Sequence, residues 1–232
     1  MKNPGRLAAA MVCALIAAGC KGKERGHAAE DSTASPSDSA PAPAALPHPV
    51  EQAEALAEDI QADIDQGAWP AATSKLDSLR TLADRLAAAG VSGTQRSAYG
   101  SALDTLNAVV VVKSKDYALV AANRVSRIVT TMMADYASRV PVAVAYMDVA
   151  GRDALYGARL DRWSDVSDAA LEVGRNYASV EAHVQARDSV LGRRVASEIK
   201  QLQDAVSAKS KTGAAGSAEA ILNDVDRIEQ TY

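Results

Sequence analysis

His183 is the only histidine after residue 50, and no other side chain there is an ordinary general base near neutral pH. Ser-His-Asp and Cys-His catalysis both require such a histidine beside a nucleophile. Its polar neighbours Glu181 and Gln185 lie two residues away and point to other faces of a helix. The two cysteines, Cys13 and Cys20, precede residue 50. The sequence therefore predicts a protein that is not an enzyme.

Residues that ligate metals occur in two patterns. Met132, Met133, Met147 and His183 contain the ligand types of a copper site, but methionine also fills gaps between helices, and we favour that interpretation. Two acidic clusters have helical spacing instead of a tight loop with a turn glycine, which favours solvated helix faces over calcium binding. They are Glu58, Asp59, Asp63 and Asp65, and Asp161, Asp165 and Asp168. We predict no metal site and no cofactor.

The most informative polar pattern is Asn123 with Arg127, which recurs as Asn223 with Arg227. A spacing of four puts both members of a pair on one face of a helix. One interpretation is an anchor, used twice, for an anionic group or a partner. The alternative is an interhelical lock of hydrogen bonds and ion pairs. These four residues are the candidate ligand or partner-binding site.

An internal repeat underlies that pattern. Residues 103–115 match residues 199–211 at an offset of 96: Leu103, Leu106, Val110, Lys113 and Lys115 correspond to Ile199, Leu202, Val206, Lys209 and Lys211. Four inserted residues would then shift the offset to 100, which aligns the two Asn-Arg pairs. The chain's only tryptophans, Trp69 and Trp163, match at an offset of 94. Small drifts of this kind fit insertions in loops of a duplicated chain.

Apolar periodicity predicts an all-α fold: a duplicated helical bundle of about eight helices, mostly in antiparallel hairpins. The first copy covers residues 50–139 and the second covers 142–232, after a break at Pro141. In the first copy we expect helix ends at Gly67 and Gly90, and a turn near Ser114 with Asp116 as the cap. One continuous helix through Ser114 is the alternative. In the second copy we expect a loop over 212–217, with Ser217 capping the last helix.

Composition supports helices and excludes one class of function. Phenylalanine is absent and aromatic residues make up 4% of the chain, so the core must be built from alanine and aliphatic side chains. The formal net charge is −4, whereas a nucleic-acid footprint requires a basic excess or a clustered basic face. We therefore expect no nucleic-acid partner.

Residues 1–19 have the pattern of an export signal that is later removed. Lys2 and Arg6 precede an apolar stretch that is too short to span a bilayer, and Ala17-Ala18-Gly19-Cys20 follows. This ending resembles the lipobox of bacterial lipoprotein precursors, although Ala17 replaces the usual larger aliphatic residue. The resemblance implies that Cys20 becomes the lipidated N-terminus, and Lys21 after it favours the outer membrane over the inner. An ordinary secretory signal is the alternative.

Residues 20–49 are rich in Pro, Ser and Ala without apolar periodicity, which predicts a disordered tether after the lipidated Cys20. Anchoring and repetition without catalytic chemistry favour a lipid-anchored periplasmic protein that binds another envelope protein or acts as a scaffold. The alternative is a lipoprotein that holds a metal ion or a small anion between the two helical copies. A polar interior pocket lined by both copies would favour this alternative, and a solid alanine-leucine core would exclude it.

Overall fold

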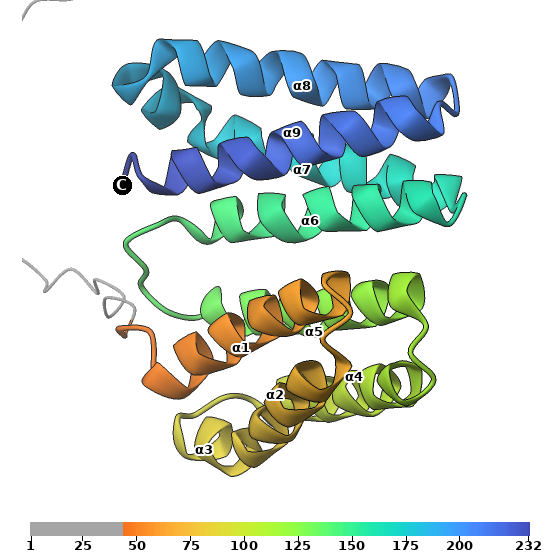
Figure 1. Ribbon diagram of the computed structural model, residues 1–232. Helices are drawn as coiled ribbons and strands as arrows, with labels where there is room; N and C mark the ends of the chain where they lie inside the picture. The colour runs from red at the N-terminus through yellow and green to blue at the C-terminus, as the bar shows by residue number, and fades with distance from the viewer. Residues whose placement is uncertain (1–43) are drawn as a thin grey trace, which may run out of the picture. The chain divides into compact units, whose positions relative to one another are not determined.

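The computed structural model describes residues 44–232, and every regular element in that range is an α-helix. The predicted all-α fold is confirmed. The helices are α1 (His48–Asp65), α2 (Trp69–Thr81), α3 (Ala83–Ala88), α4 (Gly93–Val111), α5 (Lys115–Met133), α6 (Val142–Arg159), α7 (Trp163–Arg187), α8 (Ser189–Ser207) and α9 (Lys211–Glu229) (Figure 1). We call α1 to α5 the first set and α6 to α9 the second set.

The first set begins and ends its helices close to the predicted positions. Gly67, with φ of 73°, follows α1, and Pro70 occupies the first turn of α2, where a missing amide hydrogen costs nothing. The helix predicted to run on to Gly90 is interrupted at Leu82, so it forms α2 and α3. The expected leucine stripe is nevertheless fully buried: Leu76, Leu79, Leu82 and Leu86.

The chain turns between α4 and α5, as predicted near Ser114, and the continuous helix is excluded. Lys113 has φ of 53°, which reverses the chain, and its amide donates to the carbonyl of Val110. The N-cap of α5 is Ser114, whereas Asp116 lies inside the first helical turn. The prediction of the turn is confirmed, and the prediction of Asp116 as the cap is wrong.

The predicted loop over 212–217 is also wrong, because α9 begins at Lys211. The Ser210 side chain accepts a hydrogen bond from the Gly213 amide at 3.3 Å and so caps the helix seven residues before the predicted cap, Ser217. Gly213 and Gly216 are therefore both helical. Their low helix propensity is outweighed by this cap and by the buried Ala214 and Ala218.

Because α9 begins at Lys211, the sequence comparison needs no four-residue insertion, and α5 and α9 correspond at an offset of 96 along their whole length. Both helices have 19 residues. Their buried faces match in this register: Ala118, Ala122, Val125, Val129 and Met132 correspond to Ala214, Ala218, Ile221, Val225 and Ile228. Asn223 and Arg227 are therefore one helical turn out of register with Asn123 and Arg127.

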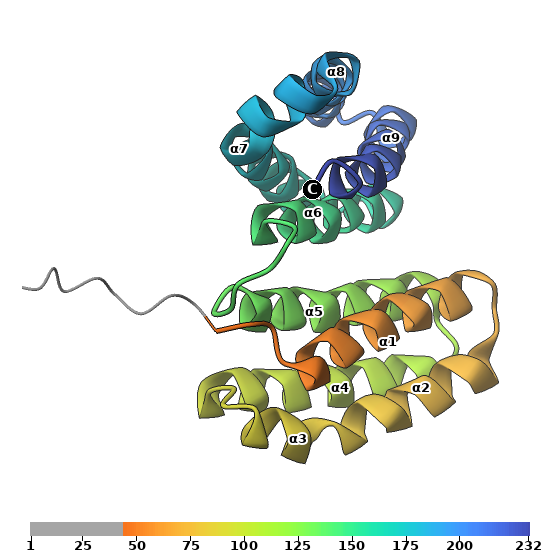
Figure 2. The ribbon, with the colours of Figure 1, turned by 90° about the vertical axis from the view of Figure 1, so that its left-hand side faces the viewer.

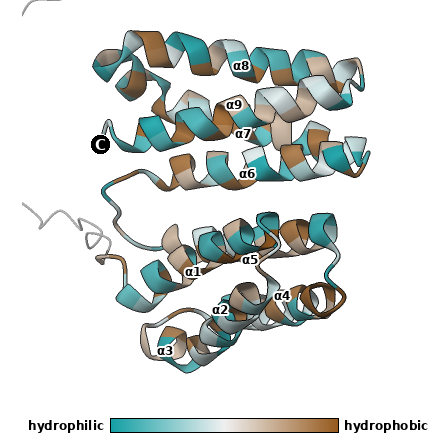
Figure 3. Ribbon diagram, in the orientation of Figure 1, coloured by the Kyte–Doolittle hydropathy of each residue, from teal (hydrophilic) through white to brown (hydrophobic). Residues whose placement is uncertain are grey.

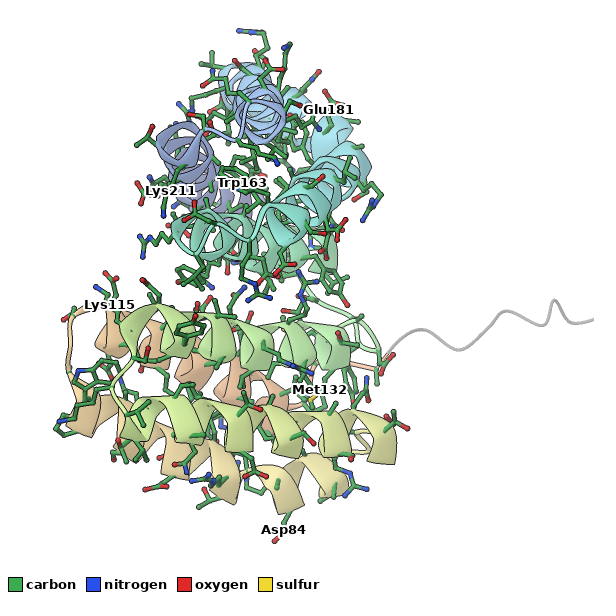
Figure 4. The ribbon with its side chains drawn as sticks, turned by 90° about the vertical axis from the view of Figure 1, so that its right-hand side faces the viewer. Asp84, Lys115, Met132, Trp163, Glu181 and Lys211 are labelled. Carbon is green, nitrogen blue, oxygen red and sulfur yellow. The ribbon has the colours of Figure 1, made fainter. Side chains whose placement is uncertain are left out.

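The turns of the two sets also agree in detail. Lys209 before α9 has φ of 49°, like Lys113 before α5. Lys115 at the start of α5 contacts Asp65, and Lys211 at the start of α9 contacts Asp161, each with 3.0 Å between Nζ and a carboxylate oxygen. Figure 4 labels both lysines. These contacts hold the start of the last helix against the end of the first helix in each set.

Each set is a ring of four helical positions, with α2 and α3 sharing one position (Figure 2). In the first set α1 and α4 both pack against α2 and α5, and in the second set α6 and α8 both pack against α7 and α9. Apolar and polar residues alternate around the helices, as Figure 3 shows, and the apolar ones form the core. Contacts between α5 and α6 join the sets, so residues 44–232 lie in one compact unit.

Candidate functional site

The junction between the sets contains Asn123 and Arg127. The Asn123 amide nitrogen donates to the backbone carbonyl of Val149 at 2.9 Å and to Asp153 Oδ1 at 2.7 Å, both on α6. The Arg127 guanidinium donates to Asp153 Oδ2 at 2.7 Å and, in a bidentate pair, to Glu172 of α7 at 2.7 and 2.9 Å. We call this group the Arg127 lock. It is an interhelical lock, the second of the two interpretations that the sequence allowed.

The Arg127 lock leaves little capacity for an anion. Four of its hydrogen bonds connect Arg127 to two carboxylates, which satisfies most of the donors of a guanidinium. Burial lowers the pKa of Arg127, but the hydrogen bonds to Glu172 and Asp153 outweigh burial and raise that pKa above its ordinary value. Arg127 is therefore held permanently charged by residues of α6 and α7.

Asn223 and Arg227 do not form a second lock. Asn223 is exposed, and Arg227 lies 3.8 Å from the Asp224 carboxylate with half of its side chain exposed. Asp224 is buried and pairs instead with Arg194 of α8. The expected twofold use of the Asn-Arg pair is thus absent, which follows from the register of α9.

A hydrogen-bonded chain of Gln61, Ser126 and Tyr156 crosses the junction beside the lock. The Gln61 amide donates to Ser126 Oγ at 2.9 Å, and Tyr156 donates to Gln61 Oε1 at 3.3 Å. All three residues are buried. The sequence does not single out these three residues, because the helical pattern shows Gln61 only as a polar residue among apolar ones. The junction is therefore held by these hydrogen bonds as well as by apolar packing.

A second charged group, the Arg152 cluster, lies on the other side of α6. Arg152 contacts Asp148 on its own helix and lies 3.8 Å from Glu58 of α1, and Glu54 and Glu229 line the same water-sized cavity of about 20 Å³. Burial and then repulsion by neighbouring carboxylates raise the pKa of Glu54 to about 7. Burial likewise raises the pKa of Asp148 to about 7, against the effect of Arg152. One arginine thus faces four carboxyl groups.

A cleft of about 390 Å³ opens beside the Arg127 lock, between α5 on one side and α6 and α7 on the other. We call it the α5–α7 cleft. Val120, Gly157 and Ala169 contribute small or apolar surface to it. Its charged residues are Arg124, Arg127, Arg162, Asp153, Asp165, Asp168 and Glu172. The volume lies within the range of small-molecule sites. This is a charged surface cleft lined by both helical sets.

Other residues singled out for chemistry have structural partners. His183 stacks on Tyr232 with 3.9 Å between ring centroids, and its Nε2 lies 3.3 Å from the Thr231 carbonyl oxygen. Met132 and Met147 are fully buried in the core, and Figure 4 labels Met132 inside the first set. Within residues 44–232, no group of three histidine, cysteine or acidic side chains is arranged to hold a metal ion.

Both acidic clusters contain ion pairs. Lys75 lies 3.3 Å from Asp59 and 2.8 Å from Asp63, and Arg162 lies 2.5 Å from Asp165. Together with the lysine contacts of Asp65 and Asp161, these pairs neutralise much of the negative charge. The clusters are thus helix faces stabilised by basic side chains, which agrees with the interpretation favoured from sequence.

The fold and this junction define a class: an all-α protein of two four-position helical rings, joined through buried polar contacts beside a charged cleft. Comparison with protein-family models, with curated proteins and with solved structures found no match to the chain. None of the described helices has the length and apolar character required to cross a membrane. Cys20 and the predicted signal and most of the tether lie outside the described residues.

Proposed function

We propose that this protein is a lipid-anchored, non-enzymatic component of the cell envelope that binds another envelope protein through the turn between α4 and α5. The observation that carries the binding surface is the exposure of three large apolar residues at this turn. Val111 is 70% exposed, Val112 69% and Tyr117 58%. We call these three residues the turn patch. All three lie within positions 111–117, and exposed apolar surface gathered at one place supports an interaction site.

The corresponding turn of the second set shows that the turn itself does not need apolar residues. At the offset of 96, Ser207, Ala208 and Gly213 stand where the turn patch has Val111, Val112 and Tyr117. The chain reversal is nevertheless the same in both turns, with φ of 53° and 49° and matching lysine-aspartate contacts. A turn of this kind therefore forms without such a patch, which supports a role of the turn patch in binding.

A photo-crosslinking amino acid at position 112, in envelopes of cells that make the full chain, tests this function. The matched control carries it at position 208 of the equivalent turn. We expect a discrete crosslinked product at 112 that is absent at 208 and that disappears when Val111→Ser and Tyr117→Ala are added. Identical products at both positions, or none at either, would show that the turn patch binds no protein.

Lipid anchoring is a separate part of the proposal and has its own test. The sequence ending in Cys20, followed by the Pro- and Ser-rich segment, supports an anchored body on a tether. Mass spectrometry of the mature protein should show an acylated N-terminus at Cys20, and Cys20→Ser should leave an unprocessed precursor in the membrane. A soluble mature chain that starts at any other residue would contradict anchoring. Outer-membrane placement, favoured by Lys21, is tested by membrane fractionation.

We also propose that the two sets arose by duplication. The common ring arrangement, the matching turns and the shared buried register of α5 and α9 support it. If the turns are equivalent, replacing Val111 and Val112 by the Ser and Ala of the second set should leave the melting temperature nearly unchanged. A loss of several degrees would mean that the two turns differ in their structural requirements.

A second candidate function is ligand binding between the two sets. The α5–α7 cleft favours it, since it is polar and is lined by α5 of the first set and by α6 and α7 of the second. A ligand in this cleft would contact both sets at once. Titration of the purified protein with small charged molecules tests this function independently of the turn patch.

A further inference from the structure

We infer that the α5–α7 cleft binds a small zwitterion of the amino-acid or short-peptide type, with the ligand's carboxylate on Arg124 and its ammonium group on Asp168. This inference rests on the second candidate function and specifies its ligand. It departs from the metal ion or small anion expected from sequence. The distribution of charges along the two walls of the cleft supports it.

Apart from Arg162, which pairs with Asp165 at the start of α7, the charges of the cleft are separated by sign. Arg124 and Arg127 come from α5, whereas Asp153 of α6 and Asp168 and Glu172 of α7 lie on the opposite wall. At one level of the cleft the walls are bridged directly, with Arg127 Nη1 2.7 Å from Glu172 Oε1. The Arg127 lock thus bridges the two walls at this level of the cleft.

One helical turn away, the next pair of opposite charges is not bridged. Arg124 precedes Arg127 by three residues on α5, and Asp168 precedes Glu172 by four on α7. Both helices run from right to left in Figure 1, so Arg124 and Asp168 lie in the same direction from the closed pair. Both side chains line the cleft and both residues are exposed. Neither makes an ion pair or a side-chain hydrogen bond within residues 44–232.

The unbridged pair, Arg124 and Asp168, indicates which class of ligand the cleft can bind. A ligand that carries both charges can bridge the two walls, because a guanidinium binds a carboxylate in a bidentate manner and a carboxylate binds an ammonium group. The apolar surface of Val120 and Ala169 lies beside this pair and suits a short aliphatic backbone.

Simple anions and cations fit the cleft less well. Its three arginines and four carboxylates give it a net negative charge, and Arg127 and Arg162 are already paired with carboxylates, so only Arg124 is left to bind an anion. The remaining acidic groups already have partners, with Arg162 at 2.5 Å from Asp165 and Arg127 on Asp153 and Glu172. A diamine could bind Asp168 through one ammonium group, but Arg124 would repel its positive charge.

Calorimetric titration of the full chain in detergent tests the inference, with glycine, glycylglycine and triglycine as zwitterions of increasing charge separation. Inorganic phosphate and 1,4-diaminobutane serve as the anion and cation controls. We expect saturable binding of at least one zwitterion and none of either control. The best chain length then distinguishes an amino acid from a peptide.

The variants Arg124→Gln and Asp168→Asn should each weaken binding about tenfold to hundredfold, since each removes one charge-assisted contact. Both residues are exposed, so the melting temperature should not change. Arg175→Gln, on α7 but in a different groove, is the matched control and should bind like the original protein. Binding of phosphate or the diamine alone would overturn the inference. The inference would also be overturned if no probe bound, or if both cleft variants still bound the zwitterion. None of these results tests binding at the turn patch.

Discussion

Replacing Arg127 by methionine should destabilise the whole chain strongly, because it removes the centre of the Arg127 lock. The substitution keeps the apolar stem but leaves Asp153 and Glu172, both of the second set, without their cationic partner from the first set. Their side chains are 31% and 23% exposed, so water screens them only in part. Breaking a fully buried ion pair costs about 3 to 5 kcal/mol. Discounted for this exposure, the expected loss of unfolding free energy is about 2 to 4 kcal/mol.

The assay is urea unfolding followed by circular dichroism, with Arg124→Met as the matched control. Arg124 lies on the same helix without an ion pair, so its substitution should change the unfolding free energy by less than about 0.5 kcal/mol. A loss of 2 to 4 kcal/mol corresponds to a melting temperature lower by roughly 4 to 16 °C for a domain of this size. Equal effects of the two substitutions would refute a structural role for the lock.

A double-mutant cycle with Glu172→Gln distinguishes the lock from simple packing. Once Arg127 is absent, neutralising Glu172 removes an uncompensated charge, so the double variant should be more stable than the sum of the single losses predicts. The expected coupling is about 1 to 3 kcal/mol. Additive losses would mean that Arg127 stabilises the junction only through its aliphatic stem.

Two further predictions concern pH and close packing. Because burial and neighbouring carboxylates raise the folded-state pKa of Glu54 from 4.5 to about 7, its contribution to stability is complete below pH 4.5 and is lost as the pH rises through 7. Unfolding free energy should therefore fall between pH 5 and 8, and Glu54→Gln should reduce that fall, whereas a rise with pH would contradict the role of the Arg152 cluster. Gly157→Ala would place a methyl carbon 2.9 Å from a Val166 methyl group, so we expect a loss of about 1 to 3 kcal/mol in urea unfolding. Gly100→Ala, which meets no atom within 4 Å, should instead stabilise α4 by about 0.5 to 1 kcal/mol, and the opposite order would show that the core relaxes around position 157.

Much of the fold could be predicted from local sequence because its signals are local. The glycines at positions 67 and 90 adopt positive φ where helices were expected to end, and Pro141 immediately precedes α6. The α9 error has an equally local cause. Two glycines and a serine within residues 212–217 resemble a loop, but the register shared with α5 places the cap at Ser210. The spacing of the buried residues in α5, applied at the offset of 96, predicts the correct start of α9. The glycine-rich composition of residues 212–217 predicted a loop instead.

The candidate site was less accessible to sequence analysis. The spacing of Asn123 and Arg127 correctly indicated one helical face, but their partners are distant along the chain. Asp153 lies 26 residues from Arg127 and Glu172 lies 45 residues from it. These partners are set by how α6 packs against α5 and how α7 packs against α6, which depends on tertiary structure. The α5–α7 cleft could not be predicted from the sequence for the same reason.

The register of α9 also explains why the lock occurs only once. At the offset of 96, Glu219 and Asn223 stand where α5 has Asn123 and Arg127, and both are exposed. The α5 helix buries this face because α6 covers it, whereas α9 is the last helix of the second set and no further set follows it in residues 44–232. The Arg127 lock therefore marks the face of α5 at which the two sets join, whereas the face of α9 at the same register positions is exposed within the described residues.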